Sequence, residues 1–177
     1  MFFIFISGGV IVVLLFVLLI DGQKDVGAKE AGTELSALAQ NIRRHYKIRP
    51  DFWGLSTREV INKRLYPLTM TAETESLHGY FGTPTTIGAD ENGTAVMPTG
   101  RQFAIAYHNL TKQQCVGLGS YNFSQDFWLG LKKVSLNNKK ETYSFEWGNK
   151  DFILPLKRSQ LKEICRQQNN TLIFYFE

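Results

Sequence analysis

The chain has 177 residues, of which 44% are apolar, 13% are aromatic and 20% are charged. This length suits one domain of ordinary size with a real hydrophobic core, which excludes a disordered or low-complexity chain. The net charge of +4 does not indicate nucleic-acid binding unless the cations gather on one face. Because residues 1–20 contain no charged side chain, a fully soluble cytosolic protein is also disfavoured.

Residues 1–20 form one apolar segment, MFFIFISGGVIVVLLFVLLI. A helix of that length spans about 30 Å, the thickness of the hydrocarbon core of a bilayer. Three interpretations compete: a cleaved secretory signal, a single-pass anchor, and a processed end from which a basic leader has been removed. The signal is disfavoured because neither a basic stretch nor a small-residue cleavage site accompanies the apolar run. Gly8 and Gly9 are either tolerated flaws in an anchor or a notch where neighbouring helices approach closely.

Residues 21–49 are expected to continue as an amphipathic helix, because no proline occurs before position 50. The four acidic residues lie between 21 and 34, and four of the basic residues lie between 43 and 49, an order that complements the helix dipole. A continuous helix over both segments would be about 70 Å long, more than a compact domain of this size needs. We expect its first half to be buried in something else and its second half to pack on the domain. The polar face is expected to carry Glu34, and the apolar face is predicted from spacings of three and four at Leu35, Leu38, Ile42 and Tyr46.

Residues 50–177 are predicted to form a globular α+β domain. Capping-box spacings at 56–59 and 111–114 predict short helices to Leu65 and around Cys115, and a third helix is predicted over 159–167. Asn92 and Gly93 form a hairpin signal between 85–87 and 95–97. The expected architecture is a long N-terminal helix packed on an antiparallel sheet with short accessory helices. Further strands are predicted at 102–108, 127–136, 142–147 and 171–176.

An active site is not evident in the sequence. His45, His78 and His108 are scattered and lack the spacing of metal ligands. No serine stands in a nucleophile elbow, and the glycines at 117–119 lack the third glycine of a dinucleotide fingerprint. The cations between 132 and 166 are interpreted as a solvated face, since no stacking aromatics accompany them. We therefore expect no enzyme activity, no cofactor, no metal and no nucleic-acid partner.

The two cysteines are Cys115 and Cys165, each inside a predicted short helix. A metal site would need more ligands at close spacing, and a catalytic thiol would need a histidine brought to it by the fold. If the anchor places the domain outside the cytoplasm, a disulfide is favoured. Two buried free thiols are the alternative.

The order of these features resembles that of type IV pilins, and within them the type IVb pilins of thin pili from conjugative plasmids and enteric pathogens. The resemblance covers essentially the whole chain, and each motif is short. In chain order the motifs are LAQNIRRHY at 38–46, WGLST at 53–57, GYFG at 79–82, FAIAY at 103–107, VSLN at 134–137 and LIFYF at 172–176.

This resemblance implies the pilin fold and a structural subunit that polymerises into an extracellular filament for adhesion or conjugative mating. It implies that Cys115 and Cys165 close the region that shapes the filament surface, and that a prepilin peptidase cuts a leader before Met1. Methylation, a stage in the inner membrane, and a pilus assembly machinery there are also implied. The residues expected in the filament core are Phe2, Phe3, Phe5, Gly8, Gly9, Val13 and Phe16.

Position five departs from the family pattern. Most type IV pilins carry a glutamate there that neutralises a neighbour's N-terminal amine, whereas this chain has Phe5. Without that ion pair the segment would pack by apolar contact alone. Some minor pilins also lack the glutamate, so a minor pilin or a secretion pseudopilin that initiates or tips the filament is one alternative. A membrane-anchored extracytoplasmic enzyme is the alternative of another class.

Overall fold

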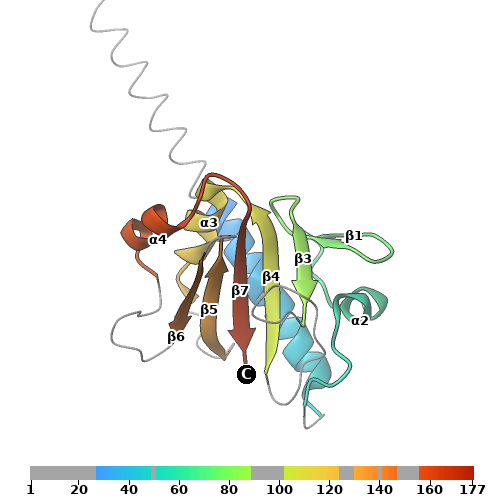
Figure 1. The fold of residues 1–177 in the computed structure, drawn as a ribbon. Coiled ribbons are helices and arrows are strands. Elements are labelled where there is room, and N and C mark those ends of the chain that lie inside the picture. Colours follow the sequence, from blue (N-terminus) through green and yellow to red (C-terminus); the bar gives the residue numbers. More distant parts are fainter. Residues whose placement is uncertain (1–26, 49–50, 89–101, 124–129, 139–140, 147–155) are drawn as a thin grey trace, which may run out of the picture.

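A computed structural model describes residues 27–48, 51–88, 102–123, 130–138, 141–146 and 156–177 (Figure 1). The expectations for the apolar segment 1–20, which include Met1 and all the predicted filament-core residues, lie outside the described residues. The predicted hairpin turn at 92–93 also lies outside them. Within the described ranges, no helix combines the length and the apolar character that a membrane span requires.

The first described element is a helix over residues 27–46, and it confirms that part of the amphipathic helix predicted over 21–49; residues 21–26 and 49 lie outside the described part. Figure 1 shows this helix, in blue, running along one face of the sheet. Each fully buried leucine contributes about 2 kcal/mol of hydrophobic free energy, so this face is a principal part of the core. The predicted stripe is buried, with 0% exposure at Leu35, Leu38 and Ile42 and 3% at Tyr46.

The helix packs on a seven-stranded antiparallel sheet of order β1-β2-β3-β4-β7-β5-β6. The C-terminal strand β7 lies in the interior of the sheet, between β4 and β5 (Figure 1). The end of the chain therefore completes the core beside the N-terminal helix. The strands are β1 (Thr71–Ala72), β2 (Leu77–His78), β3 (Pro84–Ile87), β4 (Phe103–Leu110), β5 (Leu131–Asn137), β6 (Thr142–Glu146) and β7 (Asn170–Phe176).

Side chains alternate between the two faces of the central strands, as the period of two requires. Toward the core, Phe103 pairs with Phe176 in register, and their rings stack at 5.2 Å between centroids. The opposite face holds a second, smaller apolar cluster of Ala104, Ala106 and Ile173. The large aromatic residues are thus concentrated on the core side of β4 and β7.

Three short helices complete the described fold: α2 (Thr57–Asn62), α3 (Lys112–Gly119) and α4 (Arg158–Ile164). The capping box predicted for α3 is present, with Thr111 and Gln114 bonding each other's backbone amides. The prediction that α2 reaches residue 65 is wrong. It ends at its C-cap Lys63 because Arg64 adopts a positive φ of 52°, and the next amide bonds back to the Val60 carbonyl at 2.9 Å.

Other predictions differ from the structure only at the ends of elements. The strand predicted at 127–136 is β5 over Leu131–Asn137, with residues 124–129 outside the described part. The helix predicted over 159–167 ends at Ile164, and Cys165 is its C-cap rather than an interior residue. The neighbours of β3 are β2 and β4, while its predicted partner at 95–97 lies outside the described residues.

Candidate functional site

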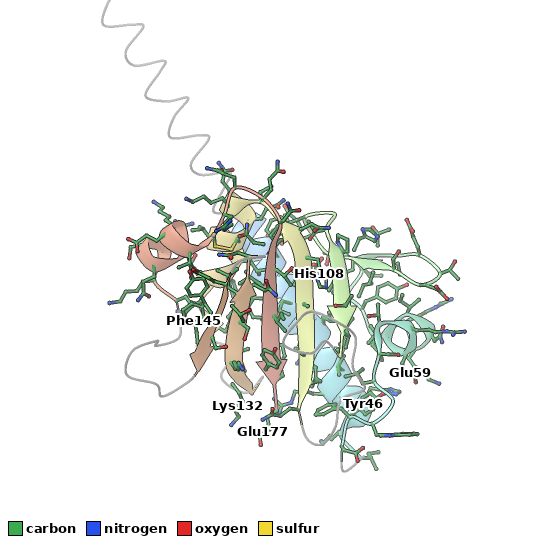
Figure 2. The ribbon with its side chains drawn as sticks, in the orientation of Figure 1. Tyr46, Glu59, His108, Lys132, Phe145 and Glu177 are labelled. Atoms are coloured by element: carbon green, nitrogen blue, oxygen red, sulfur yellow. A yellow bond between two sulfur atoms is a disulfide. The ribbon has the colours of Figure 1, made fainter. Side chains whose placement is uncertain are left out.

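A disulfide joins Cys115 to Cys165, as predicted, and its yellow sulfurs are visible near α3 in Figure 2. The two Cα atoms are 6.1 Å apart, and both side chains are buried. Because Cys115 lies within α3 and Cys165 caps α4, the bond fixes one helix against the other. It closes a region of sequence separation 50 that contains β5, β6 and α4.

Two buried asparagines hold this disulfide-closed region in place, and sequence reasoning missed both. Asn170 is fully buried; its Nδ2 donates to the Leu110 and Arg166 carbonyls at 2.9 and 2.8 Å. Its Oδ1 accepts from the Arg166 amide at 2.8 Å. Asn138 Nδ2 donates to the Ile164 carbonyl at 3.0 Å, which ties the β5–β6 turn to α4. The one available signal is that asparagine often bonds nearby backbone at turns.

The N-terminal helix approaches α3 and the residues after it closely, because both partners have a glycine at the contact: Gly32 in the helix and Gly117 in α3. A Cβ placed on Gly117 of α3 would lie 2.9 Å from the Cβ of Ala28. A Cβ placed on Gly32 would collide with the ring of Tyr121, which follows α3. The disulfide-closed region is therefore packed against the helix near residue 28.

The same helix carries a buried carboxyl group at Glu34, which is 3% exposed. The expectation that Glu34 belongs to the polar face is wrong. Its Oε1 accepts from the Tyr80 amide at 2.7 Å and from the Tyr107 hydroxyl at 3.3 Å, so it ties the helix to the β2–β3 turn. Glu34 is four positions from Leu38, so both residues lie on the same side of the helix. That spacing is the feature of the sequence that could have predicted the burial of Glu34.

The surroundings of Glu34 favour its neutral form. Burial raises the pKa of this carboxyl, while the hydrogen bonds from the Tyr80 amide and the Tyr107 hydroxyl act in the opposite direction. Burial, and then the nearby Glu34 charge, raises the pKa of Tyr107 well above its usual range. Among the described residues, Glu34 Oε2 has no hydrogen-bond partner. This cluster holds the helix on the sheet.

The histidines are not brought together. His108 lies on the sheet face opposite the helix (Figure 2), where its ring nitrogens contact the Thr86 and Thr171 hydroxyls at 2.8 and 3.4 Å. Burial lowers the pKa of His108. His45 packs edge-on against Tyr46, and His78 contacts the Gly82 carbonyl. The described part of the chain contains no group of three or more potential metal ligands.

An open groove lies where the N-terminal helix meets the disulfide-closed region. Its volume is about 540 Å³. Ala28 and Gly117 line it at the close contact between the helix and α3, and Lys29 and Arg158 contribute its cations. The groove is thus lined by Ala28 and Lys29 of the helix and by residues near the start (117–122) and near the end (156–158) of the disulfide-closed region.

Comparison with known proteins places this architecture among solved pilins. No family model matches the chain, and no curated protein matches it. The crystal structure of a type IVb pilin from Salmonella typhi superposes with a TM-score of 0.51 and 16% sequence identity, covering 86% of this chain and 97% of that chain. TcpA, a type IV pilin from the Vibrio cholerae El Tor biotype, superposes with a TM-score of 0.54 and 13% identity, covering 86% and 99%.

These similarities extend over nearly the full length of both solved pilins. At such low identity the likeness concerns the fold and not individual residues. The N-terminal helix, the antiparallel sheet and the accessory helices that the sequence predicts together form the α+β fold of the type IVb pilins.

Proposed function

We propose that the chain is a structural subunit that polymerises through its N-terminal segment into an extracellular type IVb pilus, used for adhesion or conjugative mating. One observation carries the proposal. The globular part of the chain, here called the head, already buries the stripe from Leu35 to Tyr46 in its own core, and the apolar residues 1–20 are not part of that stripe. The likeness in fold to two solved type IV pilins, of which the Salmonella typhi protein is a type IVb pilin, supports it. The subunit's main partner is another copy of the same chain.

The apolar segment would have two successive environments. Before assembly, residues 1–20 lie in the inner membrane, where the prepilin peptidase and the pilus assembly machinery act on the chain. In the pilus, the segments bundle in the filament core, where helix–helix contacts replace lipid contacts. The head carries the disulfide-closed region on the filament surface.

Phe5 is the residue that tests this arrangement most directly. Its neighbours Phe2, Phe3, Ile4 and Ile6 are all apolar, so a charge placed among them in a helix bundle would have the N-terminal amine as its nearest partner. An unpaired buried charge costs several kcal/mol or loses its charge. Phe5→Leu preserves the apolar contact, whereas Phe5→Lys introduces a cation that the amine repels.

The experiment is electron microscopy of filaments sheared from cells that express the full chain, with mass spectrometry of the main component. Phe5→Leu should give filaments like those of the wild type, and Phe5→Lys should give none while the disulfide-bonded head still accumulates. Normal filaments with Phe5→Lys would exclude a buried core position. A filament built mainly of another protein would exclude the role of major subunit.

Phe5 also favours a second candidate within the same class, a minor pilin or pseudopilin that initiates or tips the filament. In that case mass spectrometry would find the chain at low abundance relative to the main component. The absence of enzyme activity stays a prediction.

A further inference from the structure

The groove at the start of the N-terminal helix has the composition of a site for an anionic headgroup. Lys29 approaches from the helix and Arg158 from the first residue of α4, and both side chains belong to exposed residues. Ser120 and Asn122 add polar groups from the segment that follows α3, and Leu156 adds an apolar surface. Two cations beside polar groups and an apolar wall suit a phosphate that is joined to a hydrocarbon tail.

Aromatic side chains flank the same end of the helix. Tyr121 lines the groove and covers Gly32. A Cβ on Gly27 would lie 3.6 Å from the Tyr80 ring and 3.9 Å from the Phe81 ring. Positions 27 and 32 lie about 140° apart around a helix, so the rings stand on different sides of it. Tyr80 is 43% exposed. Tyrosine is enriched where a protein meets the interface of a bilayer, because its ring is apolar and its hydroxyl is polar.

The residues that line the groove on the helix lie close in sequence to the apolar segment, and this limits the distance between the groove and a bilayer that holds the segment. The apolar run ends at Ile20, and the described helix begins at residue 27. Seven residues span at most about 25 Å even when extended, and about 10 Å as a helix. If residues 1–20 occupy a bilayer, the start of the described helix is therefore held near the headgroup layer. The groove is beside that point, since it is lined by Ala28 and Lys29.

We propose that this groove binds the headgroup of an anionic phospholipid, with Lys29 and Arg158 as the phosphate-binding side chains. The occupant is a lipid of the bilayer that holds residues 1–20, so this inference rests on the proposed function. The neighbouring Glu30 does not line the groove. Tyr80, Phe81 and Tyr121 would lie against the interface around the bound lipid. The head is thereby oriented on the membrane before assembly.

The test measures lipid binding by native mass spectrometry of the full chain in neutral detergent micelles. Phosphatidylglycerol, phosphatidylcholine and inorganic phosphate are the three probes. Each cation near an anionic surface strengthens binding about fivefold, so Lys29→Gln with Arg158→Gln should weaken phosphatidylglycerol binding about 25-fold. Arg158→Lys should keep most of the binding. Each single neutral variant should lose about fivefold, which keeps the test available if the double variant does not fold.

The matched control is Arg58→Gln with Lys63→Gln, which removes two exposed cations at α2, near the other edge of the sheet from α4 (Figure 1). This variant should bind phosphatidylglycerol within twofold of the wild type. Equal losses in the two double variants would show an unspecific charge effect and overturn the site. Phosphatidylcholine binding as tight as phosphatidylglycerol, or displacement of the lipid by inorganic phosphate, would also overturn it. Because the assay uses the isolated chain, its failure is distinguishable from a failure to form filaments.

Discussion

Removing the disulfide is expected to lower the free energy of unfolding by about 4 kcal/mol. The bond joins cysteines at a sequence separation of 50. Closing a loop of that length lowers the entropy of the unfolded chain, which raises its free energy by about 4 kcal/mol at 25 °C. The appropriate variant is Cys115→Ala with Cys165→Ala. Both positions are buried, and alanine leaves no unsatisfied polar group there, as serine would.

The folded state should survive this change, because other contacts fix the same region. Asn170 bonds the backbone at Leu110 and Arg166, and Asn138 bonds the Ile164 carbonyl. Leu161 of α4 is fully buried, beside Gly119 of α3. The loss of stability is therefore expected to arise mainly in the unfolded chain, with the circular dichroism spectrum of the native protein unchanged.

Urea unfolding of the full chain in neutral detergent, followed by circular dichroism, measures this difference. If the free energy of unfolding falls by about 2 kcal/mol per M of urea, the urea concentration at the midpoint of unfolding should fall by about 2 M. Wild type treated with a reductant should match the double variant, and the reductant should not affect the double variant itself. A loss below about 1 kcal/mol with an unchanged slope would refute the loop-entropy argument.

Two further predictions concern the N-terminal helix. Because burial raises the pKa of Glu34 in the folded state above its ordinary value of 4.5, the wild type loses stability as the pH rises through the folded-state pKa. Glu34→Gln should then be more stable at neutral pH, with the difference closing below pH 4.5 in urea unfolding; a difference independent of pH would contradict this. Gly32→Ala should cost about 1–3 kcal/mol, because its Cβ collides with Tyr121. Gly27→Ala, whose Cβ meets only ordinary contacts at 3.6 and 3.9 Å, should be neutral or stabilising by up to about 1 kcal/mol; equal effects of the two alanines on the thermal midpoint would contradict the close approach.

Sequence reasoning succeeded where the determining interactions are local. The stripe from Leu35 to Tyr46 depends only on the helical period, and the α3 capping box depends on two residues three positions apart. The pairing of the cysteines was reached from the expected compartment, with free thiols left open, and the structure confirms the bond. These features need no knowledge of which strands are neighbours.

Features set by distant contacts were not predicted. The place of β7 between β4 and β5 depends on two registers, Ala106↔Ile173 and Ser135↔Ile173, that no local spacing encodes. The burial of Glu34 depends on the Tyr80 amide, 46 positions away. Strands β1 and β2 have two residues each, too few for a period of two to be recognised. The groove likewise requires α3 and α4 to meet the helix.

The pattern of exposure along the described N-terminal helix bears on the proposed assembly. Leu35, Leu38 and Ile42 have no exposed surface, so these side chains are not available to a second copy while the head is folded. Apart from Ile48 just after the helix, the exposed side chains of residues 27–48 are charged or polar. In the proposed filament, apolar contacts between copies would therefore depend on residues before 27, which include the uncharged run 1–20. A change such as Phe5→Lys should accordingly affect assembly alone, whereas Gly32→Ala should affect the stability of the head first.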